Sequence, residues 1–450
     1  MMETGADFYS VPRRFPVVLE DHILYWMRNS HDSCIRCVVE FDGRVDAARM
    51  ARALRLTLDV EPILGCRFVR KTFRHYWERM ENLDGVSLFE VLETSEYDDD
   101  IGPCLSTIPR TDLHSGPQVT ARLVRSEKDT LVIGIEHVAC DGGGAKNYLS
   151  LLASIYRNLL RDPAYRPEPN VLGSRSLRQV ILSFAPGDYF RIIRRNFRDF
   201  YEFMIPLVRR TPASMNTPFS RGTMMLRTIG PDLFRKLKEY GRRHNATVND
   251  MLLTAFLRAF YGPEKPGENL WPRTVGTVDL RRYIPGKKAG ALCNLSGFTY
   301  LSIGSRLGTA FDDTLFFVRD RLGDHKSDYI GLGPIPISAI LFKTLPFSAA
   351  LWIHDQMGNA QKKQASSGRD VAPLFTNTGS IHAGEMDFGD ALVKLSYITT
   401  TIATPPVLAV SLSGFHENLT ITAGFCETAV TKSEVKRILD VMENEISSLT

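Results

Sequence analysis

The sequence lacks two features that would place it outside ordinary globular proteins. Its longest apolar stretch, Gly331 to Ile353, is broken by three prolines and a lysine, whereas a membrane-spanning helix needs about 20 consecutive, largely apolar residues. Lys and Arg number 55 against 51 Asp and Glu, a net charge of +4. This excess is far too small to suggest nucleic acid as the main partner. We therefore expect a globular protein without a transmembrane segment.

Cysteine is also scarce. The seven cysteines are scattered, and the chain opens with Met1-Met2-Glu3-Thr4-Gly5, without the basic start or apolar core of an export signal. We therefore expect reduced cysteines and a cytoplasmic location. Cys34 and Cys37 form a Cys-x-x-Cys pair, but residues three apart on a strand face opposite sides, and no second Cys or His pair lies at ligand spacing. We expect no metal site.

The length and the hydrophobic patterning predict two domains. At about 150 residues per domain, 450 residues correspond to two or three. Alternating and helical apolar spacings predict strands near 34–41, 118–124, 130–137, 223–229, 273–280, 297–303, 392–400, 407–413 and 419–425, and helices near 46–58, 144–161, 231–243 and 248–261. A basic, aromatic helix is predicted at 188–210. This order predicts two mixed α/β domains, 1–185 and 221–450, joined by a linker helix within 186–220.

The sharpest chemical signal is the segment Ile135-Glu136-His137-Val138-Ala139-Cys140-Asp141-Gly142-Gly143-Gly144. His137 ends a predicted strand on the face of Ile133 and Ile135, because alternate strand residues share a face. Asp141 follows beyond a turn, and the glycines remove side chains where a ligand or another backbone would approach closely. The pattern predicts a slot beside a partly desolvated imidazole. The plainer alternative is a core histidine with satisfied hydrogen bonds at a strand end.

Other segments accompany this motif in a fixed order. They are Glu61-Pro62-Ile63-Leu64, Thr247-Val248-Asn249-Asp250, Asp279-Leu280-Arg281, Asn294 and Phe375-Thr376-Asn377-Thr378-Gly379. With His137-x-x-x-Asp141-Gly142, they make the sequence resemble the CoA-dependent acyltransferase superfamily over nearly its whole length. That superfamily includes peptide-synthetase condensation domains, alcohol acetyltransferases, wax ester synthases and polyketide-associated acyltransferases. Asp387-Phe388-Gly389 further looks like a shortened Asp-Phe-Gly-Trp-Gly segment of its plant members.

The resemblance implies a fold and a class of donor. The fold would be α/β, with two chloramphenicol-acetyltransferase-like domains, mixed sheets flanked by helices, and an active-site tunnel between the domains. An acyl-CoA, or the phosphopantetheine thioester of an acyl carrier protein, would enter from one face and the acceptor from the other. No permanently bound cofactor and no metal would be required.

The resemblance also implies roles for particular residues. His137 would be the general base, a task that suits the side chain that most readily exchanges a proton near neutral pH. Asp141, followed by Gly142, would point away from the substrate and support the site by pairing with Arg281. Asp387 is a competing partner for Arg281, and the sequence leaves this choice open. Asn294 and Asn377 are candidates for donating to the developing oxyanion or contacting substrate.

Two residues within the motif, Glu136 and Cys140, suggest other interpretations of the chemistry. Many relatives carry a second His where this chain has Glu136, and on a strand Glu136 faces opposite to His137, so its carboxylate should not share the site. This departure argues against a condensation-domain reaction more strongly than against simple acyl transfer. Cys140 invites a nucleophile interpretation, but a buried cysteine is usually a small apolar filler.

The sequence therefore predicts an acyltransferase that moves an acyl group from an acyl-CoA or acyl-carrier thioester to an alcohol or amine acceptor, by general-base catalysis without a covalent intermediate. One alternative is a condensation-type, amide-forming enzyme acting on carrier-protein substrates; another is a non-catalytic binding protein of the same fold. The Arg-rich stretch from Tyr189 to Tyr201 could dock one face on the core or contact a membrane surface peripherally. The apolar stretch from Ile335 to Ile353 could line a pocket for a lipid-like substrate or be ordinary core.

Overall fold

The computed structural model describes most of the chain. It describes residues 11–28, 32–71, 75–97, 100–108, 111–204, 222–262, 272–303, 307–332, 345, 348–349, 352–353, 356, 372–403, 405 and 407–449. Most of the apolar stretch from Ile335 to Ile353 and the end of the predicted 188–210 helix lie outside these residues. No helix within the described ranges combines the length and apolar character that crossing a membrane requires.

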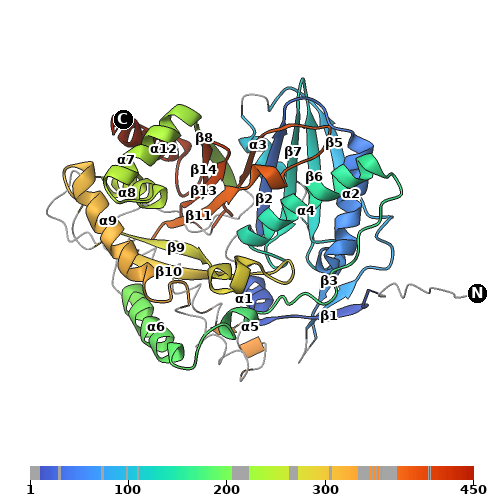
Figure 1. Cartoon of the computed structure of the whole chain (residues 1–450), viewed down its shortest axis with the longest axis horizontal. Helices are drawn as coiled ribbons and strands as arrows, with labels where there is room; N and C mark the ends of the chain where they lie inside the picture. The colour runs from blue at the N-terminus through green and yellow to red at the C-terminus, as the bar shows by residue number, and fades with distance from the viewer. Residues whose placement is uncertain are drawn as a thin grey trace, which may run out of the picture.

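Two large sheets, one in each lobe, carry the fold (Figure 1). The first has the order β12 (Val393–Ile398), β2 (Cys34–Phe41), β7 (Asp129–Glu136), β6 (Val119–Arg125) and β5 (Phe89–Glu93). The second has the order β10 (Ser296–Ser302), β9 (Arg273–Asp279), β11 (Leu374–Ile381), β13 (Ala409–Phe415), β14 (Asn418–Cys426) and β8 (Gly222–Ile229). A small third sheet consists of β1 (Arg14–Pro16), β4 (Tyr76–Arg79) and β3 (Cys66–Val69).

Both large sheets are mixed, as predicted. In the first, β5 runs parallel to β6 and the other pairs are antiparallel. In the second, β11 runs parallel to β9 and β13. Where β11 pairs with β9, Leu374 lies opposite Val275 and Phe375 lies opposite Gly276.

Helices cover the sheets in layers (Figure 1). The α-helices in the described ranges are α1 (Leu19–Met27), α2 (Ala47–Val60), α3 (Gly102–Thr107), α4 (Gly142–Arg161), α5 (Arg178–Ile181), α6 (Asp188–Met204), α7 (Pro231–Arg243), α8 (Val248–Tyr261), α9 (Phe311–Lys326) and α12 (Lys432–Ser448). Short 3-10 turns are η2 (Pro62–Gly65), η4 (Leu280–Tyr283), η5 (Pro285–Lys287) and η6 (Ala383–Glu385). In the first lobe α2 and α4 share a core with β2 and β7, and in the second α8 and α12 share one with β13 and β14.

The two faces of the first sheet bury different residues, which explains the Cys-x-x-Cys pair. Cys37 lies in the core under α2 and α4, whereas Cys34 lies in the cluster on the other face, with Leu105 of α3 and Met224 of β8. Both thiols are buried and reduced. The predicted opposite orientation of the two cysteines is therefore confirmed.

The lobes are interlocked by two segments. β12, from the second half of the sequence, pairs with β2 and so belongs to the first sheet. In the other direction, the linker helix α6 packs on the second lobe, where Arg195 donates to Thr299 of β10 and contacts His325 of α9. The strand β12 and the helix α6 therefore each join a lobe to a segment from another part of the sequence.

Candidate active site

The predicted strand, turn and helix around His137 are present. β7 ends at Glu136, and the backbone N–H of His137 donates to Ser33 O at 2.7 Å, which fixes the imidazole just beyond the strand. Asp141 is the N-cap of α4: its Oδ1 accepts from the backbone N–H of Gly144 at 2.8 Å. A capping carboxylate satisfies a backbone donor that the first helical turn leaves without a partner.

One tautomer of His137 is set by the turn. Its Nδ1 lies 3.0 Å from the carbonyl oxygen of Cys140. A carbonyl oxygen only accepts, so this contact assigns the hydrogen to Nδ1 and, in the neutral ring, the lone pair to Nε2. That is the state in which an imidazole can take a proton from a substrate.

Asp141 and Arg281 form a buried, two-point ion pair. Arg281 Nη1 lies 3.0 Å from Oδ2 and Nη2 lies 2.9 Å from Oδ1 of Asp141, and both side chains are at most 5% exposed. The N–H of Leu295 and the hydroxyl of Ser296 also donate to Asp141 Oδ2. Burial acts to raise the pKa of the Asp141 carboxyl, but Arg281 and the backbone donors outweigh it and lower that pKa.

The choice that the sequence left open between two carboxylates is thus resolved. Asp387 does not contact Arg281 but pairs with Arg157 at 2.7 Å on the surface, where its side chain is 49% exposed. Asp141 consequently ties the start of α4 to the η4 turn and to the start of β10, across the two lobes.

Of the three glycines after Asp141, two are closely packed against other groups of the protein and one borders a cavity. A Cβ at Gly143 would lie 2.5 Å from Arg281 Nη1, and one at Gly144 would lie 2.7 Å from the Cβ of Cys140. Side chains there would displace the ion pair or the turn that holds His137. Gly142, in contrast, lines a cavity together with His137.

That cavity lies between the lobes and has a volume of about 350 Å³. His137 and Ile35 line it from the first lobe, and residues of β9, β10, β11 and the segment after β12 line it from the second. Its wall is largely apolar, with much of the apolar surface from one side of α1: Leu19, Ile23, Leu24 and Met27. The imidazole therefore meets a space whose wall favours an apolar substrate group.

The helix α1 was not predicted to be part of the site. The signal was present, because Leu19, Ile23 and Met27 recur every four residues on one helical face. The same helix brings Glu20 to the cavity wall. Burial raises the pKa of the Glu20 carboxyl to about 7, and its Oε1 accepts from the N–H of Leu177.

The two candidate asparagines separate in the structure. Asn294 lines the cavity of His137 and donates from Nδ2 to Val138 O at 2.9 Å, so it also braces the turn beyond the histidine. Asn377 lies elsewhere: neighbouring residues of β11 face opposite sides, and its amide donates to Asn249 in a second cavity. Asn377 therefore does not line the cavity of His137, and a contact between Asn377 and substrate stays a prediction.

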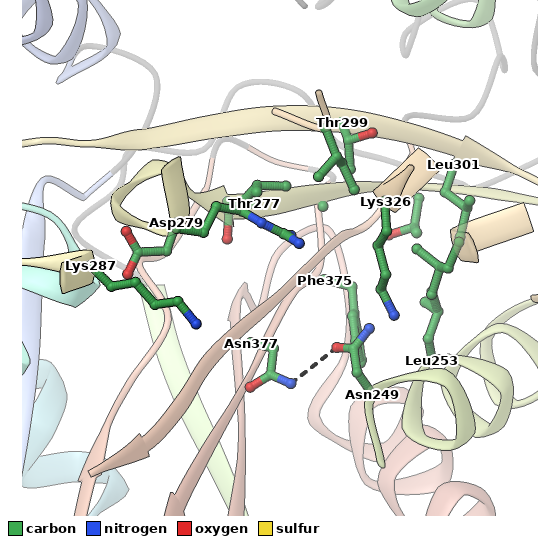
Figure 2. Close-up of a pocket in the computed structure, with 16 residues that line it drawn as sticks. Asn249, Leu253, Thr277, Asp279, Lys287, Thr299, Leu301, Lys326, Phe375 and Asn377 are labelled. Atoms are coloured by element: carbon green, nitrogen blue, oxygen red, sulfur yellow. Dashed lines mark hydrogen bonds between the residues drawn. The ribbon is translucent and has the colours of Figure 1, made fainter. Parts of the chain in front are cut away.

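The second cavity, of about 460 Å³, carries positive charge (Figure 2). Lys287 and Lys326 extend into it from η5 and α9, and Arg282 also lines it. Against these three cations the lining includes the carboxylate of Asp279. Lys326 forms an ion pair with the buried carboxylate of Asp250 at 3.4 Å. Thr277 lines both cavities, and its hydroxyl is hydrogen-bonded to that of Thr376, which lines the cavity of His137.

Glu136 and Cys140 do not line the cavity of His137. Glu136 accepts from the hydroxyls of Ser33 and Thr111 on the other side of the strand, and burial raises the pKa of its carboxyl to about 7. Cys140 is fully buried, and burial together with the charge of Asp141 raises the pKa of its thiol well above the usual range. A thiol in this setting stays protonated and is a poor nucleophile.

Comparison with known proteins identifies the fold. No family model matches the sequence, and no curated protein sequence matches it. Among solved structures, a condensation domain, the first of the calcium-dependent antibiotic synthetase in complex with substrate analogue 2a, is similar with a TM-score of 0.68 and 17% identity, covering 97% of this chain and 96% of that one. Polyketide synthase associated protein 5 from Mycobacterium tuberculosis gives 0.66 and 13%, covering 97% and 98%.

The epimerization domain from the third module of tyrocidine synthetase B is also similar, with a TM-score of 0.61 and 12% identity, covering 99% of this chain and 98% of that one. The predicted two-lobed, chloramphenicol-acetyltransferase-like fold is thereby confirmed, with 97% of the chain covered by the condensation domain. Condensation and epimerization domains share it, so the fold does not specify the reaction, which has to be argued from the site.

Proposed function

We propose, from a fold shared with condensation domains and polyketide synthase associated protein 5, that this protein is an acyltransferase. It moves an acyl group from a pantetheine thioester, on CoA or on a carrier protein, to an alcohol or amine. The observation that supports this most is His137, held by the Cys140 carbonyl in the tautomer of a base, at the wall of an apolar cavity between two lobes.

The reaction needs one base and one well-placed thioester. Nε2 of His137 takes the proton of the acceptor hydroxyl or amine as the oxygen or nitrogen attacks the thioester carbonyl. A C–O or C–N bond forms, the C–S bond breaks, and the imidazolium returns the proton to the departing thiolate. The enzyme forms no covalent bond to the acyl group, consistent with the protonated, buried state of Cys140.

The start of α4 is suited to stabilise the charge that develops on the thioester oxygen. Gly142 lines the cavity at the N-terminus of a 20-residue helix, where the backbone dipoles carry partial positive charge. Asp141 and Arg281 act one layer behind as positioning residues, because they hold this helix end against the second lobe. Asn294 does the same for the turn that carries His137.

The second cavity, called here the cation-lined cavity, suits the anionic end of the donor. Phosphopantetheine is a narrow arm that ends in phosphate, and Arg282, Lys287 and Lys326 offer positive charge in a cavity that shares Thr277 with the cavity of His137. In this arrangement the phosphate stays with the cations while the thioester reaches the imidazole. The cavity thus supports a thioester donor over an activated acyl group without phosphate.

A second candidate is amide formation between carrier-bound substrates, favoured by the condensation-domain structures that share the fold. It uses the same base and differs in the acceptor. A product screen separates the two: the protein is incubated with acyl-CoAs of several lengths and pooled alcohols and amines, with His137→Ala as the matched control, and products and free thiol are measured by mass spectrometry. Ester or amide formed only by the wild type supports the proposal, and free thiol without a transfer product contradicts it.

A further inference from the structure

Helix α6 has two faces of different character. One face is buried against the second lobe and consists of Ile192, Arg195, Asn196 and Asp199. Arg195 pairs with Asp199 at 2.7 Å and reaches Thr299 and His325, so this face holds the helix on the second lobe. The opposite face is available for another task.

That opposite face is bulky and apolar. Phe190, Ile193, Phe197 and Tyr201 are 76%, 50%, 70% and 71% exposed. Steps of three, four and four residues place them within about 80° of one another around the helix, so they form a continuous stripe. Single exposed apolar residues are common, but a contiguous exposed stripe of this kind marks an interaction surface.

Arginines border the stripe along one side. Arg191, Arg194 and Arg198 lie about 40° to 100° around the helix from Phe190. The side chains of Arg191 and Arg194 are 50% and 66% exposed, and both share a single carboxylate, Asp328, at 3.9 and 3.5 Å. Arg191 also lies near Asp188, donates to Ser327 O and stacks on Tyr329. The outward side of α6 therefore combines aromatic groups with two arginines that stay at least half exposed.

We propose that this face of α6 docks on an anionic membrane surface. The stripe would enter the boundary between headgroups and acyl chains, where amphipathic aromatic rings are preferred, and the arginines would bind lipid phosphates. A single convex helix presents a row of side chains and no groove, which suits a planar lipid interface better than a folded partner. In Figure 1 α6 lies at the outer edge of the second lobe, beside β10 and α9. The inference is independent of the proposed catalysis.

The test is co-sedimentation of the full chain with vesicles of phosphatidylcholine alone and with 30% phosphatidylserine (roughly one anionic lipid in three). We expect binding to the anionic vesicles that weakens with salt. Phe190→Ser with Phe197→Ser should weaken it at least about tenfold, since two large apolar groups are lost. Arg191→Gln and Arg194→Gln should each weaken it about fivefold.

The matched control is Leu172→Ser with Leu392→Ser, two residues that are 86% and 70% exposed away from α6 and whose replacement should leave binding unchanged. Equal binding by wild type and the phenylalanine variant overturns the proposal, and so does absence of binding to anionic vesicles. A dimer in solution that the same variant dissociates would assign the stripe to a second copy of this chain and also overturn it.

Discussion

Breaking the Asp141–Arg281 pair should cost much of the stability of the protein. In Arg281→Ala, the Asp141 carboxylate, 1% exposed, loses two contacts of about 3 Å, and the carbonyl of Cys293 loses a donor at 2.9 Å. In Asp141→Asn, Arg281 keeps the exposed Asp279 as its remaining carboxylate partner in the described part of the chain. Removing one member of a buried pair costs about 3–5 kcal/mol, a large part of the ~5–15 kcal/mol that stabilises a typical protein.

The assay is urea unfolding of the two single variants and the double variant. Because the two side chains contact each other, their effects should not add: the double variant should be more stable than the sum predicts, by about 0.5–3 kcal/mol. Asp387→Asn is the matched control. It breaks the pair with Arg157, which is partly exposed on both sides, and should cost less than about 1 kcal/mol.

Two results would refute this reasoning. Strictly additive single and double variants would show that the contact between Asp141 and Arg281 is wrong. Lost activity with unchanged unfolding in Asp141→Asn would move Asp141 from a positioning role into the chemistry itself.

Other expectations concern neighbouring groups. Cys140→Ala should keep most of the turnover, and intact-protein mass spectrometry should find no acyl group on Cys140; an acylated cysteine refutes the direct mechanism. The Glu136 carboxyl, with its pKa raised to about 7 from about 4.5, favours the fold when neutral, so wild-type stability should fall as pH rises between these values. Glu136→Gln should flatten that slope in unfolding curves, and an unchanged slope would place the titration elsewhere. Lys287→Glu should raise KM for acyl-CoA several-fold with little change in kcat, and the salt dependence of KM should weaken; no effect would remove the cation-lined cavity from donor binding. In competition, octanoyl-CoA should outcompete acetyl-CoA, because each buried CH₂ contributes ~0.8 kcal/mol in the apolar cavity; a preference for acetyl contradicts this.

Local patterns predicted the segment that carries His137. Alternation along 130–137, a capping Asp141 and the glycines determine the strand, turn and helix almost independently of the rest of the chain. The orientation of Cys34 and Cys37 follows from the same alternation. These are properties of neighbouring residues, which a sequence records directly.

Contacts between residues far apart in the sequence could not be predicted in this way. Alternation marks 392–400 as a strand, but its pairing with β2, more than 350 residues earlier, depends on how the lobes close. Arg281 had two candidate carboxylates, and the structure pairs it with Asp141 while Asp387 pairs with Arg157. Asn377 was a candidate because of the segment in which it lies, but the alternation of side chains along β11 places it in the second cavity. The short helix α1 was not predicted, although it contributes four apolar side chains to the wall of the cavity of His137.

The central claim is that His137 is the general base, and turnover of His137→Ala with an accepted donor and acceptor tests it most directly. The account predicts turnover about 10² to 10⁴ below wild type, the usual contribution of a general base, with unfolding curves that match the wild type. A folded His137→Ala variant that turns over at the wild-type rate would contradict it.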